Sequence, residues 1–233
     1  MTAMPISVTI DGPAGVGKST VGRRVARELQ LPFLDTGLLY RAVALVAAER
    51  SVGPEGAAEL VHGLGLAINL DPTAPEWAWR ARIGERDLGA ELWAPGNAVL
   101  LARVAAEPAV RAALLPLQRR LGSEGVVAVG RDTGSTVFPR AEVKVYLDAP
   151  FEVRMERRRS ELERLGLASA EVAVREDLAE RDHRDSTREA APLAIPDGAM
   201  VIDTAPIDAE EVARRIVSRC HELGAQPTTH QRS

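Results

Sequence analysis

The stretch Ile6-Ser-Val-Thr-Ile-Asp-Gly-Pro-Ala-Gly-Val-Gly-Lys-Ser-Thr20 decides the fold of this chain. Alternating apolar residues up to Ile10 predict a strand, and the glycines that follow match the phosphate-binding spacing G-x-x-x-x-G-K-[ST]. Glycine lets the backbone approach an anion closely, and the N-terminus of the next helix adds its positive end. Lys18 can then reach the terminal phosphates of a nucleotide, and the Ser19 hydroxyl can bind Mg²⁺. A glycine-rich turn that binds nothing is disfavoured, because a strand pattern precedes the motif and a helix pattern follows it.

The scarcity of lysine supports this interpretation. Lysine and arginine total 29, yet only Lys18 and Lys144 are lysines. The chain uses arginine almost wherever it needs a cation, so the lysine at position 18 indicates a need for a compact charge on a flexible stem.

Length and composition limit the possible functions. The 233 residues, 45% of them hydrophobic, suffice for one domain or for one core with a small insert. The 3% aromatic content disfavours binding of single-stranded nucleic acid, and the net charge of −4 disfavours binding to duplex DNA or to an anionic membrane. Without a long apolar run or a signal-peptide pattern, and with Cys220 alone, we expect a reducing cytoplasm and a small buried thiol.

Helix and strand patterns alternate along most of the chain. Strands are expected at 6–10, 31–34, 126–129, 143–147 and 199–202. Helices are expected at 16–29, 36–49 with Thr36 as N-cap, 52–63, 95–107, 108–120, from 150, 169–186 and after Asp208. Residues 64–88 instead alternate like a small antiparallel patch, with a turn at 71–75. This order predicts an α/β core with an inserted lobe.

Two later stretches place charged residues where a ligand would bind. Arg131 and Asp132 follow the apolar run Val126–Val129, and ligands of open α/β sheets lie beyond the carboxyl ends of strands. In the helix 169–186 an apolar stripe continues into Arg181, Asp185 and, beyond it, Arg188, which suggests that the helix extends over a cleft. An exposed Arg181–Asp185 ion pair is the simpler alternative.

Four arginines lie on the helix that follows Pro150. They are interleaved with glutamates, so a solvated surface is the simplest interpretation for most of them. The four are Arg154, Arg157, Arg158 and Arg159.

Five stretches together resemble bacterial cytidylate kinases, of the nucleoside-monophosphate kinase class. They are Ile10–Thr20, Leu34–Arg41, Pro108–Arg111, Gly130–Pro139 and Arg181–Arg188 with Ala191–Leu193, and they span residues 6 to about 220. Many enzymes share the first stretch, whereas Gly130–Pro139 and Arg181–Leu193 are far more specific. The resemblance implies transfer of the γ-phosphoryl group of ATP to CMP or dCMP, with Mg²⁺. We expect a monomer, and from its composition we expect it to bind neither nucleic acid nor membrane.

The resemblance also implies an architecture. The fold would be a P-loop kinase of the α/β class, with a five-stranded parallel sheet flanked by helices. Residues 1–63 and 123–223 would form the core, 64–122 a monophosphate-binding insert, and 150–188 a mobile lid, followed by a disordered tail at 224–233.

Site residues follow from the same resemblance. ATP would be bound by Gly12, Pro13, Ala14, Gly15, Val16, Gly17, Lys18, Ser19, Thr20, Arg154 and Arg158, with Ser19 as the metal ligand. CMP would be bound by Thr36, Tyr40, Arg41, Arg111, Arg131, Asp132, Arg181, Asp185 and Arg188. Lys18, Arg131, Arg158 and Arg188 would be the catalytic group. Arg111 and Asp132 would contact the cytosine, and Arg181 and Asp185 the ribose.

The chain departs from the family pattern at a few positions. Trp93 stands where the family usually has Arg, Ala102 where it has a Ser that contacts the base, and Thr133 and Ser135 where Ile and Thr are typical. A UMP/CMP or shikimate-type acceptor is the alternative among kinases, and a nucleotide-binding regulator without turnover is the alternative outside them. A P-loop GTPase is disfavoured because the chain has no Asn-Lys-x-Asp signature.

Overall fold

The computed structural model describes residues 6–63, 66–70, 79–93, 98–164, 166 and 171–224. The chain divides into two compact units, which we describe separately. Unit 1 contains Met1–Leu34 and Gly122–Ser233, and unit 2 contains Asp35–Leu121. The expected turn at 71–75, the expected helix starts at 95 and 169, and the tail from residue 225 lie outside the described residues.

A five-stranded sheet forms the centre of unit 1. Its order is β2-β6-β1-β7-β8, with β1 at Ser7–Asp11, β2 at Phe33–Asp35, β6 at Val126–Gly130, β7 at Val143–Asp148 and β8 at Met200–Asp203. Strand β1 runs parallel to β6 and β7, so that Ile10 pairs with Val129 and Val145. Val8, Thr9 and Ile10 are all fully buried, as expected for a parallel strand covered on both faces. The predicted α/β class and parallel sheet are confirmed.

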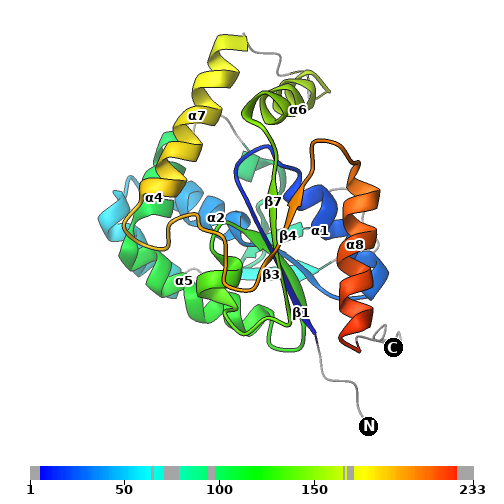
Figure 1. Cartoon of the computed structure of the whole chain (residues 1–233). Coiled ribbons are helices and arrows are strands. Elements are labelled where there is room, and N and C mark those ends of the chain that lie inside the picture. The colour runs from blue at the N-terminus through cyan, green and yellow to red at the C-terminus, as the bar shows by residue number, and fades with distance from the viewer. Residues whose placement is uncertain are drawn as a thin grey trace. The chain divides into compact units, whose positions relative to one another are not determined.

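Four long helices complete unit 1. Helices α1 (Lys18–Leu29) and α8 (Ala209–Glu222) pack side by side (Figure 1), and Asp208 caps α8 by accepting from the backbone N–H groups of Glu210 and Glu211. Helix α6 (Phe151–Arg164) follows β7, and α7 (Glu171–Thr187) contacts α6. A single π-helical turn, Thr133–Val137, follows β6.

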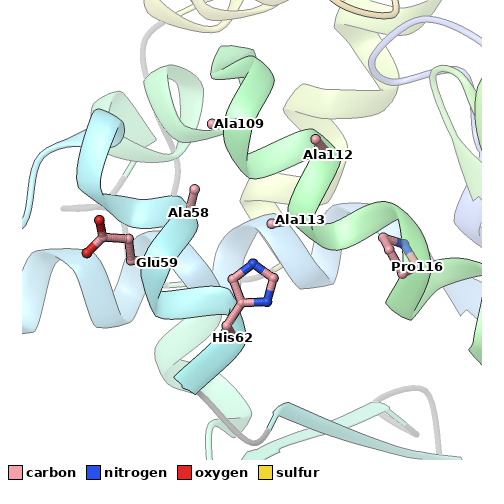
Figure 2. Close-up of a pocket in the computed structure, with 7 residues that line it drawn as sticks. All are labelled: Ala58, Glu59, His62, Ala109, Ala112, Ala113 and Pro116. Atoms are coloured by element: carbon pink, nitrogen blue, oxygen red, sulfur yellow. The ribbon is translucent and has the colours of Figure 1, made fainter.

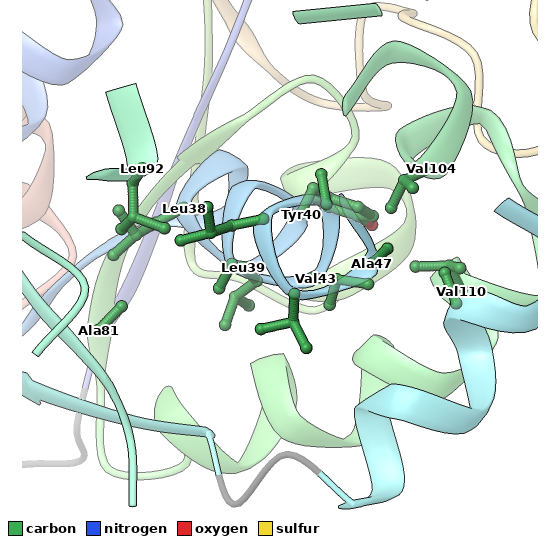
Figure 3. Packing of buried hydrophobic residues seen from close by; sticks show 14 of the residues in the cluster. Leu38, Leu39, Tyr40, Val43, Ala47, Ala81, Leu92, Val104 and Val110 are labelled. Atoms are coloured by element: carbon green, nitrogen blue, oxygen red, sulfur yellow. The ribbon is translucent and has the colours of Figure 1, made fainter. Parts of the chain in front are cut away.

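Unit 2 is built around the apolar helix α2 (Thr36–Glu49). Around it lie the short 3₁₀ turn Pro54–Gly56, α3 (Ala57–Gly63), the antiparallel strands β3 (Leu66–Leu70), β4 (Trp79–Ile83) and β5 (Arg86–Asp87), the 3₁₀ turn Gly89–Trp93, α4 (Ala98–Ala106) and α5 (Pro108–Leu121). The close-up in Figure 3 shows Leu39 and Val43 of α2 in the cluster that also contains Val110 of α5.

Two expectations about α2 differ from the structure. The N-cap is Asp35, whose carboxylate accepts from the N–H of Gly37, and Thr36 is the first helical residue, because the aspartate has the extended backbone of a cap. The compact unit begins at Asp35, whereas the sequence places the insert at 64–122. The reason for this difference is that α2 is apolar on most faces and supplies the centre of the unit 2 core.

Cys220 is buried in α8, and burial raises the pKa of its thiol to about 12, as suits a small apolar residue. Within the described ranges, no helix is both long and apolar enough to span a membrane.

Candidate active site

The glycine-rich loop joins β1 to α1. Gly12 has φ +150°, and a Cβ there would overlap the carbonyl oxygen of Leu147, so no other residue fits without a shift of the backbone. Lys18 is the first residue of α1; its side chain folds back over the loop, and Nζ donates to the carbonyl oxygen of Pro13 at 2.6 Å. Lys18 is only 8% exposed. Ser19 follows it in the first turn of the helix and is half-buried.

Asp11, the last residue of β1, connects the start of this loop to the turn after β6 by hydrogen bonds. Its carboxylate accepts three hydrogen bonds, from the N–H and the hydroxyl of Thr133, both at 2.8 Å, and from the N–H of Gly134 at 2.7 Å. Burial raises the pKa of Asp11, and these hydrogen bonds oppose the shift. The turn thus starts at a fixed distance from the phosphate loop. This role of Asp11 was not predicted, although a carboxylate at the end of an apolar strand pattern was a signal.

Four of the predicted acceptor residues come together in unit 1. Arg131 follows β6, and its Nε donates to Asp185 of α7 at 2.6 Å. Arg188 contacts Asp132 at 3.3 Å and Asp185 at 3.7 Å, and the side chains of Arg188 and Asp132 are both 8% exposed. Two arginines and two carboxylates therefore neutralise one another where β6 meets α7.

Arg181 does not pair with any of these four residues among the ion pairs described here. It pairs with Asp177, one turn earlier on α7, at 3.1 Å. The simple alternative of an Arg181–Asp185 pair is therefore not the arrangement found, because Asp185 pairs with Arg131. The apolar part of the stripe is confirmed: Val174 and Leu178 are buried in a small cluster with Met155 of α6.

The arginines of α6 divide into buried and surface residues. Arg154 is 7% exposed and donates to the carbonyl oxygens of Ala149 and Ala14 and to Asp182. Arg157 contacts Thr204 at 2.8 Å, whereas Arg158 pairs with Glu161 at 2.7 Å on the surface. Arg154 is therefore not solvated, because its guanidinium has one backbone acceptor in the phosphate loop, at Ala14, and another just after β7, at Ala149.

Asp182 is a residue that the sequence analysis missed. It accepts from the N–H of Ala14 and pairs with Arg154. A signal existed, because Asp182 lies four residues after Leu178 and therefore continues the buried stripe of α7.

The remaining predicted acceptor residues belong to unit 2. Thr36 and Tyr40 lie one turn apart on α2 and are buried. The guanidinium of Arg111 lies 5.2 Å from the centre of the Tyr40 ring, and it donates to the carbonyl oxygen of Ala105 at 2.9 Å. Arg41 donates to the carbonyl oxygen of Leu92 at 3.4 Å.

Unit 2 also has a shallow hollow between α3 and α5, of about 460 Å³. Figure 2 shows its lining: Ala58, Glu59, His62, Ala109, Ala112, Ala113 and Pro116. Methyl groups make up most of this surface, and none of the predicted site residues lines it. It offers no group of arginines that could hold a phosphate.

Comparisons with known proteins place the chain in a family. The family model described as cytidylate kinase matches residues 8–222. A cytidylate kinase of Methylococcus capsulatus is 42% identical over 215 residues, which cover 91% of this chain and 95% of that protein. A bifunctional pantoate ligase/cytidylate kinase of Synechocystis is 41% identical over 92% of this chain, and the match spans 42% of that longer protein. An uncharacterised protein of Eubacterium ventriosum has a similar fold, with a TM-score of 0.50 and 14% identity, and the match covers 93% of this chain and 98% of that one.

Proposed function

The chain belongs to the cytidylate kinase family, and on this basis we propose that it transfers the γ-phosphoryl group of ATP to CMP or dCMP. The products would be ADP and CDP or dCDP. The observation that carries the proposal is the combination, in unit 1, of Lys18 folded over a glycine-rich loop with the group of Arg131, Asp132, Asp185 and Arg188. We further propose that the enzyme is a cytoplasmic monomer.

The chemistry needs positioning more than it needs a base. The nucleophile is an oxygen of the acceptor phosphate, whose second pKa of about 6 leaves it largely deprotonated at pH 7. The difficulty is the repulsion between two polyanions, which cationic side chains offset most strongly as charge develops in the transition state. A lid that excludes water would also prevent hydrolysis of ATP.

On the donor side we propose that the loop from Gly12 to Thr20 holds the ATP phosphates, with Arg154 and Arg158 as lid contacts. The ammonium group of Lys18 would stabilise the negative charge while the γ-phosphoryl group passes from ATP to CMP. Ser19 would hold Mg²⁺, which when bound would supply positive charge that offsets part of the charge of the donor phosphates. Ser19 fits a ligand role through its place in the first turn of α1. Over the described ranges, no group of three or more His, Cys, Asp or Glu residues could hold a metal, which suits an ion held partly by substrate phosphates.

On the acceptor side we propose separate groups of residues for the phosphate, the ribose and the cytosine of CMP. Thr36, Tyr40, Arg41, Arg131 and Arg188 would hold the phosphate end of CMP. Arg181 and Asp185 would bind the ribose, and Arg111 and Asp132 the cytosine. The arginines that already pair with carboxylates would exchange those partners for phosphate oxygens, because bidentate contacts with phosphate are at least as strong.

The proposed function is tested by ADP release across a panel of acceptors. We expect turnover with CMP and dCMP, far less with UMP, and none with AMP, GMP or shikimate. ADP release that is equal with and without CMP would contradict a kinase, and a preference for UMP or shikimate would identify the alternative acceptors.

A first prediction concerns the choice of base. Cytosine offers an amino donor where uracil offers a carbonyl acceptor. The Asp132 carboxylate can accept from the amino group but would face the lone pairs of uracil, and sites built on hydrogen bonds reject such analogues strongly. Ala102 offers no polar side chain, so selectivity should rest on Asp132 with Arg111. We expect Asp132→Asn to lower the CMP/UMP ratio of kcat/KM at least about tenfold.

The measurement is that ratio at saturating MgATP. Asp132 also pairs with Arg188, so Asp132→Asn should change phosphate binding equally for both nucleotides, and the ratio cancels this shared change. Asp185→Asn is the matched control, because it removes a carboxylate charge from the same cluster and should leave the ratio unchanged. A ratio that stays the same in Asp132→Asn would show that another group recognises the base.

A further inference from the structure

An ion pair binds both backbone polar groups of Ala14, a residue of the phosphate loop. The carbonyl oxygen of Ala14 accepts from Nη1 of Arg154 at 3.1 Å, and its N–H donates to Oδ1 of Asp182 at 3.2 Å. The other oxygen of Asp182 accepts from the same Arg154 nitrogen at 2.5 Å. Arg154 comes from α6 and Asp182 from α7, so the two helices together hold the two peptide groups that flank the Cα of Ala14.

Apolar packing supports the same contact. The methyl group of Ala14 lies in the small buried cluster with Met155 of α6 and with Val174 and Leu178 of α7. At the next residue, Gly15, a Cβ would lie 3.0 Å from the carbonyl oxygen of Arg154, so α6 packs directly on the loop backbone. The ion pair therefore lies beside closely packed side chains that restrict the motion of the loop. The side chain of Arg154 is 9% exposed and that of Asp182 is 22% exposed.

The same helix carries residues of the acceptor group. Asp185 lies three residues after Asp182, on the same side of α7, and pairs with Arg131. Because a helix moves as a rigid element over one turn, a shift of α7 that repositions Asp185 also repositions Asp182.

We propose that Asp182 is a positioning residue that couples occupation of the acceptor site to the shape of the ATP-binding loop. Asp182 holds Arg154 and the backbone N–H of Ala14 in place. An acceptor nucleotide bound near Asp185 and Arg188 restricts the motion of α7 and so stabilises these contacts of Asp182. ATP then binds a loop that is already ordered. This inference rests on the proposed function, because it assigns the two sites to donor and acceptor.

The test measures binding rather than turnover. Calorimetry would give the Kd of magnesium and a non-hydrolysable ATP analogue, with and without CMP, for the wild-type protein and for Asp182→Asn. The asparagine can still accept from Ala14 with its oxygen but turns an N–H₂ donor toward Arg154. We expect Asp182→Asn to bind the analogue about fivefold to tenfold more weakly than the wild type does. The factor by which CMP lowers the Kd of the analogue should fall from its wild-type value to about one. The Kd of CMP alone should change less than about twofold.

Two further variants serve as comparisons. Glu180→Gln removes an acidic residue from the same helix, where Glu180 forms an exposed pair with Arg184, and should match the wild type in every measurement. Asp182→Glu keeps the charge and should recover part of the coupling. If Asp182→Asn leaves the analogue's affinity and the CMP effect unchanged, or weakens CMP and the analogue equally, the coupling role is wrong.

The failure of this proposal can be told apart from a failure of the proposed function. If the wild-type protein binds the ATP analogue but does not bind CMP, the assigned acceptor is wrong. The effect of Asp182→Asn on the analogue alone then still decides whether Asp182 positions the loop.

Discussion

Lys18→Ala is expected to lower kcat by roughly a hundredfold to a thousandfold, the usual cost of removing a group that stabilises transition-state charge. Lys18 is the only cation on the glycine-rich loop itself, and its Nζ lies over that loop, on the carbonyl oxygen of Pro13. In the proposed reaction this ammonium group is required most when charge moves from ATP to CMP. The Kd of CMP should change little, because the lysine serves the donor phosphates.

The measurement combines kcat at saturating substrates with the Kd of CMP. The chain offers a matched control in Lys144, the second of its two lysines, which donates to the carbonyl oxygen of Asp197 on the surface. Lys144→Ala should keep wild-type activity. A Lys18→Ala protein that retains more than about a tenth of kcat would have lost less than about 1.4 kcal/mol of transition-state stabilisation, and the proposed role would be wrong.

Asp11→Ala is expected to reduce the free energy of unfolding by about 3–5 kcal/mol. The substitution leaves the N–H groups of Thr133 and Gly134 buried without an acceptor, and each such group costs about 1–3 kcal/mol. It also removes the acceptor of the Thr133 hydroxyl. Since about 1 kcal/mol corresponds to about 2–4 °C in a protein of this size, calorimetry should record a fall in Tm of about 6–20 °C.

Two comparisons make the Asp11 result specific. Asp203 ends strand β8 of the same sheet in an exposed position, where it accepts from the N–H of Ala205, so Asp203→Ala should cost no more than about 0.5 kcal/mol. Asp11→Asn has nearly the same shape, yet its amide must present a donor to Thr133 or Gly134. We therefore expect Asp11→Asn to lower the free energy of unfolding almost as much as Asp11→Ala does. If Asp11→Asn is as stable as the wild type, the three hydrogen bonds contribute little net stability.

The local patterns of the chain predicted most of its secondary structure. The strand, loop and helix around Gly12 and Lys18 follow from residue spacing, because glycines and a helix N-terminus act over a few residues only. The continuous apolar run at Val126–Val129 likewise predicted a buried parallel strand, and the structure has β6 there. The cap of α2 was predicted one residue late, since Asp35 and Thr36 are both good capping residues and only the backbone conformation separates them.

The sequence by itself determined the class of the fold, the phosphate loop and the family resemblance from which we propose the acceptor residues. Only the tertiary structure decided which charged groups meet. Asp11 and Thr133 are 122 residues apart in the chain, and Asp182 and Ala14 are 168 apart. Helix α7 carries aspartates at 177, 182 and 185 and arginines at 175, 181 and 184, and spacing alone permits several pairings among them. Among these aspartates it is Asp182 that pairs with Arg154, because α7 packs against α6 and the phosphate loop at this point. An ion pair depends on which side chains the packed core brings within contact distance.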